Sequence, residues 1–585
     1  MKHLKKVIAL VLTLVTALAM ATPAFAAEGK PADASISVSG LEAGDKVNFY
    51  QVLKYDETAA ATGGWVNATG FTLTNDEIQK IVGKGDYATD GTKESEKGID
   101  AALAARIAGM ASGTAKFANV DATDGTATAA TTKVGDAGLY VAIVAPGKPD
   151  YLYNPVFVAA DYTEGGTNTP AAATTLSYEP ESLAKKENVT LTKEIDGTAD
   201  TKYDVNVGDT VNFTISSKVP AFSAAYQNPT YVITDTMEAG LEVQGNPAVT
   251  VAGVNLADGD YTVNVASDKK SFTVTLNQGG LKKVAATGRA QEITVTYGAK
   301  VTSIENATVS EKENEATVKF SNNPSDSNSY SLLEDKTRTY SFTIDGNLLG
   351  YTGTSYETDE LVKVGLNADG TPATETKQYH SGTTWTELSP LKGAVFGLYT
   401  DPDCTNAYTN EVFNGTVTSD ANGRLKIQGL DEGTYYLKET SAPAGYIMDN
   451  RTFEITIAAT YTEIEAGQYT NSDNIVVKYD AYKVLNSYTV TVDDGKNTAA
   501  SKYNIENKGP VDHKVVDKAA YQTITGEGAG EFAGDVVTPI SNTKGTELPS
   551  TGGMGTKILY TIGGLMVVAG GVFLAAKKRM STIEE

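Results

Sequence analysis

The sequence has very few of the side chains that carry disulfide, metal or nucleophile chemistry. It contains one cysteine, Cys404, and three histidines among 585 residues. A single cysteine excludes an intrachain disulfide bond. His380 and His513 have no metal-ligand spacing and no nearby GxSxG serine, so neither zinc chemistry nor a serine hydrolase is expected. The sequence therefore predicts no metal, no cofactor and no enzymatic activity toward other molecules.

Basic residues are also in the minority. Lys and Arg total 48 against 72 for Asp and Glu, which gives a formal net charge of −24. An acidic surface argues against nucleic acid as a partner, because the phosphate backbone attracts clustered Lys and Arg. The charge instead keeps the chain soluble.

The N-terminus has the three parts of a secretory signal peptide. Three lysines within the first six residues precede an apolar run over residues 7–21, and Ala24-Phe25-Ala26 supplies the small residues of a cleavage site. We expect residues 1–26 to be removed, so that the mature chain starts at Ala27. The exported protein would then have to remain stable without disulfides.

A second processing signal lies near the C-terminus. A five-residue motif is followed by an uncharged run over residues 558–576, long enough to cross a bilayer, and by a basic cluster at 577–579 that favours the cytoplasmic side. This order resembles the LPxTG cell-wall sorting signal of Gram-positive surface proteins. The resemblance implies that a sortase cleaves after the Thr and transfers it to an amine, whereas the alternative is an uncleaved anchor helix. The motif is Leu548, Pro549, Ser550, Thr551 and Gly552.

Between these signals the pattern predicts a mainly β fold of tandem immunoglobulin-like β-sandwiches. Val, Thr, Ile and Tyr alternate with polar residues, and Gly, Asn and Asp separate the runs. A small helical insertion is expected in the first domain, from Thr74 through Val82 and over residues 99–110. We expect extra strands, rather than a fourth domain, within 451–537. The predicted domains are 27–185, 186–357 and 358–545, followed by the sorting signal at 546–585.

The second domain has polar residues at positions that face its core. Lys193 shares strand parity with Val189, Leu191 and Ile195, so it points inward. An acid and an amide follow the same rule on later strands. Asp235 lies on the face of Tyr231 and Ile233, and Asn322, rather than its neighbour Asn323, lies on the face of Val318 and Phe320.

The third domain repeats the same three types in the same order. Lys363 shares a face with Leu361, Glu439 with Leu437, and Asn542 with Ile540. An inward lysine taken alone would be read as the frayed end of a strand. The repetition of lysine, acid and asparagine indicates a chemical arrangement.

Burial makes these three side chains reactive toward one another. Desolvation favours the neutral, nucleophilic lysine amine and the neutral, proton-donating acid. The acid can polarise the asparagine carbonyl and shuttle a proton to the departing ammonia, while folding holds the amine against the amide. The product would be an Nε-(γ-aspartyl)lysine isopeptide bond, which cross-links a chain that has no disulfides.

The residues around these positions resemble known pilin domains. Gly433-Thr434-Tyr435-Tyr436-Leu437-Lys438-Glu439 and Ala442-Pro443-Ala444-Gly445-Tyr446 are similar to the E-box of Gram-positive Cna B-type domains, and Lys193, Asp235 and 320–324 resemble the second domain of backbone pilins. The resemblance implies two isopeptide bonds, Lys193–Asn322 with Asp235 as the acid and Lys363–Asn542 with Glu439. In the first domain Val144 stands where the acid would fall and the opening strand 36–38 has no lysine, so no bond is expected there.

A backbone pilin also needs an exposed lysine that joins subunits. The family's YPKN motif is absent, but Lys185 and Lys186 lie in a polar stretch just before the second domain. They are the candidates, and the alternative is that both are solvated linker charges.

The resemblance implies a secreted, wall-anchored shaft subunit whose Thr551 is joined by sortase to a lysine of the next copy. Expected partners are a pilin-class sortase, a housekeeping sortase with a peptidoglycan precursor, minor pilins and a host surface ligand. The alternatives are a minor pilin or a monomeric anchored adhesin.

Overall fold

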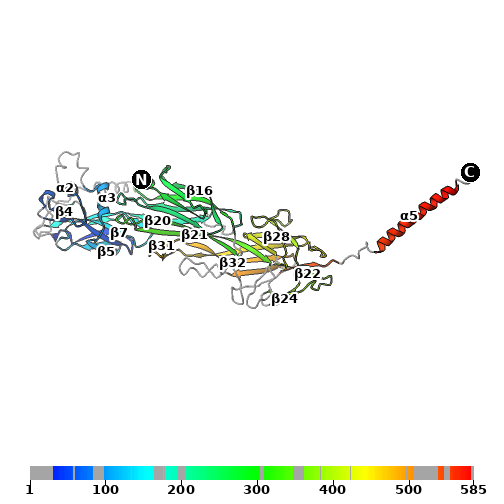
Figure 1. Ribbon diagram of the computed structural model, residues 1–585. Helices are drawn as coiled ribbons and strands as arrows, with labels where there is room; N and C mark the ends of the chain where they lie inside the picture. The colour runs from blue at the N-terminus through cyan, green and yellow to red at the C-terminus, as the bar shows by residue number, and fades with distance from the viewer. Residues whose placement is uncertain are drawn as a thin grey trace, which may run out of the picture. The chain divides into compact units, whose positions relative to one another are not determined.

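The computed structural model describes most of the exported chain and assigns it mainly to β-strands, which confirms the predicted fold class (Figure 1). The signal peptide and the five-residue sorting motif lie outside the described residues. The described residues are 30–56, 59–82, 98–133, 135–163, 176, 178–195, 205–303, 309–346, 361–381, 384–421, 423, 425–495, 498–504, 538–545 and 554–581.

The chain divides into two compact units. The first contains residues 1–341, 461–486 and 507–518, and the second contains 342–460, 487–506 and 519–585. The first unit therefore includes the first predicted domain and the second predicted domain up to residue 341. Residues 461–486 also group with it, although they follow much of the predicted third domain in sequence.

The N-terminal part of the first unit is a β-sandwich with helices on one outer face. A sheet in the order β4-β3-β7-β9, with β5 also paired to β3, packs its inner side chains against the three-stranded sheet β11-β2-β6. β7 is buried along nearly its whole length because α2 and α3 cover its other face. The strands are β1 Lys30–Pro31, β2 Ser35–Ser39, β3 Lys46–Tyr55, β4 Trp65–Asn67, β5 Phe117–Asp121, β6 Thr126–Ala130, β7 Gly138–Ala145, β8 Tyr151–Tyr153, β9 Val156–Ala160, β10 Tyr162–Thr163, β11 Glu181–Leu183 and β12 Lys186–Asn188.

The two helices confirm the sequence prediction. α2 spans Asn75–Val82 and starts with a capping box, in which Glu77 N donates to Thr74 Oγ1 at 3.3 Å and Thr74 N donates to Glu77 Oε2 at 2.8 Å. α3 spans Ala101–Met110, and its N-cap residue Asp100 accepts a hydrogen bond from Leu103 N at 2.8 Å.

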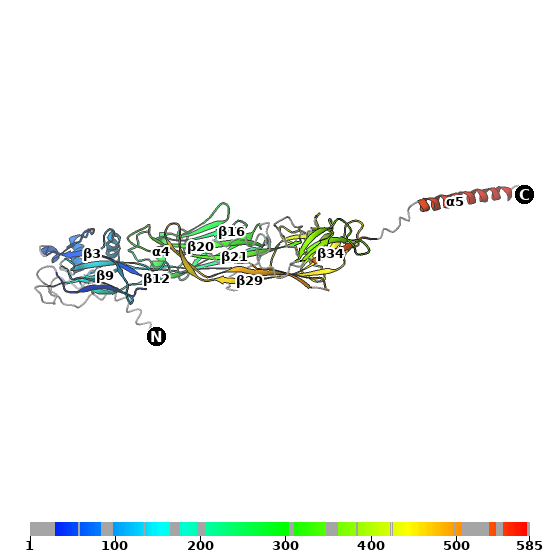
Figure 2. The same cartoon turned by 90° about the horizontal axis from the view of Figure 1, so that it is seen from below.

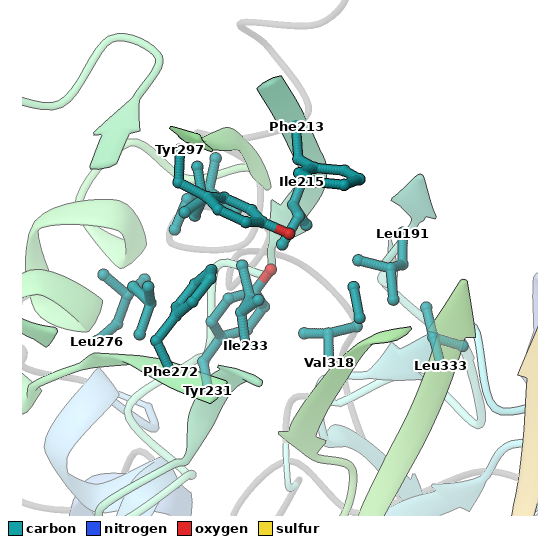
Figure 3. Close-up of a cluster of buried hydrophobic side chains, with 14 of the residues drawn as sticks. Leu191, Phe213, Ile215, Tyr231, Ile233, Phe272, Leu276, Tyr297, Val318 and Leu333 are labelled. Atoms are coloured by element: carbon teal, nitrogen blue, oxygen red, sulfur yellow. The ribbon is translucent and has the colours of Figure 1, made fainter. Parts of the chain in front are cut away.

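The C-terminal part of the first unit is a second sandwich. The sheet β13-β14-β19-β16 faces a larger sheet that contains β17, β18, β15, β20, β21, β31 and β30. Figure 3 shows Phe213 and Tyr297 of the first sheet opposite Tyr231 and Phe272 of the second, within one buried core. Its elements are β13 Leu191–Ile195, β14 Thr210–Val219, β15 Tyr231–Met237, β16 Leu241–Val251, β17 Tyr261–Val265, β18 Ser271–Leu276, α4 Gln278–Ala285, β19 Gln291–Val301, β20 Val309–Ser321, β21 Tyr330–Gly346, β30 Gly467–Thr470 and β31 Val476–Tyr479.

The second unit is built around the sheet β26-β25-β28-β29-β32-β33, and β22 pairs in parallel with β34. Figure 2 labels β29 of this sheet and β34. The strands expected within 451–537 are present as β29 to β33, which lie between residues 452 and 504. The remaining bounds are β22 Leu361–Leu366, β23 Lys377–Ser381, β24 Thr384–Leu388, β25 Val395–Tyr399, β26 Thr416–Thr418, β27 Leu425–Leu430, β28 Gly433–Ser441, β29 Thr452–Ile464, β32 Tyr482–Asp493, β33 Thr498–Asn504 and β34 Thr538–Thr543.

The chain ends in one long helix, α5, at Met554–Ser581. Residues 560–579 are apolar and long enough to cross a membrane, and their side chains are exposed. This helix covers the predicted apolar span and the basic cluster that follows it.

Candidate functional site

The second unit brings together the three polar residues that the sequence predicted for it. Lys363 lies on β22, Asn542 lies on the parallel strand β34, and Glu439 lies on β28. The register pairs Lys363 with Ile540 and Gly365 with Asn542, so the two side chains come from neighbouring positions on adjacent strands. All three residues are buried.

Glu439 contacts both reaction partners. Lys363 Nζ donates to Glu439 Oε2 at 3.3 Å and also donates to Asn542 Oδ1, and Asn542 Nδ2 donates to Glu439 Oε1 at 2.8 Å. The backbone N–H of Asp449 holds Oε2 of the same carboxylate at 2.7 Å. The acid is thus fixed between the amine that would attack and the nitrogen that would leave.

The surroundings favour a reactive amine. Burial lowers the pKa of Lys363 from 10.5 to about 8, although the nearby Glu439 acts in the opposite direction. The Phe396 ring lies 5.2 Å from Lys363 Nζ. About a tenth of this lysine is therefore a neutral nucleophile at pH 7, far more than at its usual pKa.

The second sandwich of the first unit holds a related cluster. Lys193 Nζ donates to Asp235 and to Tyr297 Oη, the latter at 2.7 Å, and Asn314 Nδ2 donates to the same Tyr297 oxygen at 2.8 Å. The lysine and Asp235 side chains are fully buried. The predicted pairing of Lys193 with Asp235 is present in the structure.

The structure places Asn314 in this cluster, whereas the predicted amide partner, Asn322, lies outside it. Asn322 Nδ2 donates to Ser331 Oγ at 3.0 Å, and its carbonyl accepts from Ser329 at 2.6 Å, so its polar atoms are engaged elsewhere. The β15–β20 register places Asp235 opposite Ala316, two residues from Asn314.

Strand parity could not separate these two asparagines. Asn314 and Asn322 share parity, but each residue advances a strand by about 3.3 Å, so they are separated by roughly 25 Å. Parity identifies the face, and only the pairing register identifies the position along it. The alternation of Asn314 with Ala316, Val318 and Phe320 would have made Asn314 a second candidate without deciding between it and Asn322.

Burial also sets the protonation of this cluster. It lowers the pKa of Lys193 and raises the pKa of Asp235, while the attraction between the two opposes both shifts. Burial, followed by the nearby Asp235, raises the pKa of Tyr297 well above its usual range, so the phenol stays protonated. Asn314 Oδ1 and Asp235 Oδ1 have no hydrogen-bond partner, which is costly for buried polar atoms in an unreacted site.

The first sandwich has a different buried acid. Asp45 accepts hydrogen bonds from the Tyr151 and Tyr153 hydroxyls, each at 2.7 Å, and from two backbone N–H groups. Val144, at the position compared with Glu439, is a buried core residue. The expected absence of an isopeptide bond in this domain stays a prediction.

The candidate joining lysines, Lys185 and Lys186, lie in sequence between the first and the second sandwich of the first unit. Lys186 is in β12, paired with Tyr153 of β8, and its amine forms an ion pair with Glu42. Lys185 is more exposed, with 56% of its side chain accessible against 29% for Lys186, and its amine donates to Gly288 O at 2.8 Å. The polar linker that the sequence predicted therefore contains a short strand at Lys186.

Comparisons with known proteins define the class first. The model for a prealbumin-like fold domain matches residues 385–470, that for the Cna-B-like domain of Gram-positive pilin backbone subunit 2 matches 207–324, and that for the LPXTG cell wall anchor motif matches 540–580. The chain is a cell-wall-anchored surface protein of the Gram-positive type.

Comparisons with individual proteins then indicate which kind of surface protein the chain resembles. The chain is 27% identical to the trypsin-resistant surface T6 protein of Streptococcus pyogenes serotype M6 over 472 residues, which cover 77% of this chain and 80% of that protein. It is 33% identical to fimbrial subunit type 2 of Actinomyces naeslundii over 119 residues, or 20% and 22% of the two chains. The solved T6 backbone pilin of Streptococcus pyogenes shares the fold, with a TM-score of 0.50, 19% identity and coverage of 88% of this chain and 98% of that chain.

These matches support a backbone pilin of a Gram-positive pilus, and the chain is similar to the T6 protein along most of its length. Pilins of this family are structural proteins rather than enzymes.

Proposed function

We propose that this chain is the self-cross-linked shaft subunit of a covalent pilus. Two internal bonds, Lys193–Asn314 and Lys363–Asn542, would form on folding. The observation that carries the proposal is the buried bridge from Glu439 to both Lys363 and Asn542. A carboxylate held between a nucleophilic amine and an amide nitrogen is the arrangement that proton transfer between them requires.

The reaction follows from this geometry. Lys363 Nζ attacks Asn542 Cγ, the bond from Cγ to Nδ2 breaks, and ammonia leaves. Glu439 takes a proton from the amine through Oε2 and supplies one to the departing nitrogen through Oε1. Asp235 is the corresponding acid for Lys193 and Asn314.

Polymerisation would join the sorting motif of one subunit to a lysine that precedes the second sandwich of the next subunit. A pilin-class sortase would cleave after Thr551 and transfer that carbonyl to Lys186 or Lys185 of the next subunit. A housekeeping sortase would transfer the finished fibre to a peptidoglycan precursor. Minor pilins and a host surface ligand are the remaining expected partners. Lys185 is the more accessible amine, and each lysine has a carboxylate beside it to accept a proton: Glu187 lies 3.2 Å from Lys185 Nζ, and Glu42 pairs with Lys186.

The test of polymerisation replaces each candidate lysine with arginine, which keeps the charge but cannot form the amide. In producing cells, the joining lysine is the one whose replacement abolishes the ladder of high-mass, detergent-resistant species. Lys46→Arg, which changes another surface ion pair, is the matched control. A ladder that persists in the double variant Lys185→Arg/Lys186→Arg would overturn the assignment.

A further inference from the structure

The two clusters differ in the length of their acids. In the second unit, Glu439 touches Lys363 Nζ with one oxygen and Asn542 Nδ2 with the other. In the first unit the acid is Asp235, whose side chain is one methylene shorter. Asp235 accepts from Lys193 Nζ, and its other oxygen, Oδ1, has no hydrogen-bond partner.

The hydroxyl of Tyr297 lies in the gap that the shorter acid leaves. It accepts hydrogen bonds from Lys193 Nζ at 2.7 Å and from Asn314 Nδ2 at 2.8 Å, and it is also hydrogen-bonded to Asp235. A phenol has one proton to donate and two lone pairs to accept with. Because Lys193 and Asn314 occupy both acceptor positions, the proton is directed at Asp235.

We propose that Tyr297 is a catalytic residue of the first-unit cross-link, acting as the proton relay between Asp235 and the departing nitrogen of Asn314. This inference rests on the proposed isopeptide bond between Lys193 and Asn314. Glu439, with its additional methylene, contacts the asparagine nitrogen directly. For the shorter Asp235, the Tyr297 hydroxyl makes this contact with the asparagine nitrogen. In the second unit the ring of Phe396, which has no hydroxyl, lies 5.2 Å from Lys363 Nζ.

The relay balances. Asp235 first takes a proton from the Lys193 ammonium, and the neutral amine attacks Asn314 Cγ. The protonated Asp235 then donates to the Tyr297 oxygen, so the hydroxyl proton turns from Asp235 to Nδ2. Tyr297 gives that proton to Nδ2 while Asp235 returns a proton to the Tyr297 oxygen. Asp235 next takes the remaining surplus proton from Nζ, the Cγ–Nδ2 bond breaks, and ammonia leaves. The cluster ends with an amide, a neutral Asp235 and an unchanged Tyr297, which needs no oxidant or other reactant.

The surroundings allow the hydroxyl to be removed without removing the ring. Tyr297 stacks on Phe213 with ring centroids 5.3 Å apart and meets Phe272 edge-on at 4.8 Å, contacts that phenylalanine would keep (Figure 3). Tyr297→Phe therefore tests the hydroxyl, and adding Asp235→Glu tests whether a longer acid replaces it.

The experiment uses pulsed cell-free synthesis of the full-length chain in mild detergent, quenched at intervals and analysed by peptide mass spectrometry. The rate at which the Lys363–Asn542 cross-link forms in the same molecule serves as the internal control. We expect Tyr297→Phe to slow formation of the Lys193–Asn314 cross-link by at least about 100-fold, the usual contribution of general acid–base catalysis. The rate of Lys363–Asn542 cross-link formation should stay unchanged. Asp235→Glu in the Tyr297→Phe background should recover at least about tenfold of that loss.

Two results would overturn the relay. One is a Tyr297→Phe chain that forms the Lys193–Asn314 cross-link as fast as the wild type. The other is a slowed variant that the longer acid does not rescue, because a merely structural role for the hydroxyl gives that pattern. Failure of the underlying function is distinguishable, since the wild-type chain would then show no Lys193–Asn314 cross-link at any time.

Discussion

Replacing Glu439 with glutamine separates the acid's chemistry from its packing. The amide has nearly the same shape and can still accept the Asp449 N–H hydrogen bond, but it cannot shuttle a proton between Lys363 and Asn542. We expect the Glu439→Gln chain to fold without forming the Lys363–Asn542 bond. Its mass should be higher than that of the fully bonded chain by about 17 Da, the ammonia that is not lost.

The stability cost follows from the length of the loop that the bond closes. Lys363 and Asn542 are 179 residues apart in sequence. By the loop-entropy relation used for covalent cross-links, closing such a loop stabilises the folded state by about 5 kcal/mol. For a unit of this size, that free energy corresponds to a decrease of roughly 10–20 °C in melting temperature.

The assay is intact mass followed by thermal unfolding of the same samples. The control is the Lys363→Met chain, which cannot form the bond in any case. Adding Glu439→Gln to it measures the direct packing effect of the substitution, to be subtracted. A Glu439→Gln chain that retains the bond would refute the proposed role of the acid. A chain that lacks the bond but melts within a few degrees of the wild type would refute the loop-entropy argument.

Two further predictions test the amide partner and the buried amine. The Asn314→Ala chain should be about 17 Da heavier than the mass calculated for that variant with two bonds, because one ammonia is not lost. The Asn322→Ala chain should match the mass calculated for that variant with two bonds. If Asn322→Ala loses one bond and Asn314→Ala does not, the proposed Lys193–Asn314 pairing is wrong. In the unbonded Asn542→Ala chain, the folded-state pKa of Lys363 is about 8 and its unfolded value is 10.5, so the unfolded chain binds more protons between them. Stability of that variant should rise from pH 8 to 9.5, a trend that Lys363→Met in the same background should abolish.

Much of this architecture was accessible from residue patterns. Alternation predicted the β fold, and the Thr74–Glu77 capping box predicted the start of α2. Parity placed Lys193 and Asp235 on inward faces, and the structure brings both into one cluster. These features are local, because period-2 alternation and a cap are set by neighbours within a few residues.

The features that sequence reasoning missed depend on pairing between distant strands. The choice between Asn314 and Asn322 is made by the register of β20 against β15, which parity cannot provide. The contact of Tyr297 with Lys193 depends on the packing of two sheets, and residue spacing gave no sign of it. Residues 461–486 join the first unit because β31 pairs with β21 at Leu332–Glu334, a long-range parallel pairing without a local signature.

The central claim is that two specific covalent bonds form within one chain. The most direct measurement is intact mass of recombinant residues 27–545, followed by peptide mapping of the cross-linked fragments. The account predicts a deficit of about 34 Da, one ammonia per bond, with fragments that join Lys193 to Asn314 and Lys363 to Asn542. An unshifted mass, with all four residues recovered in separate linear peptides, would contradict it.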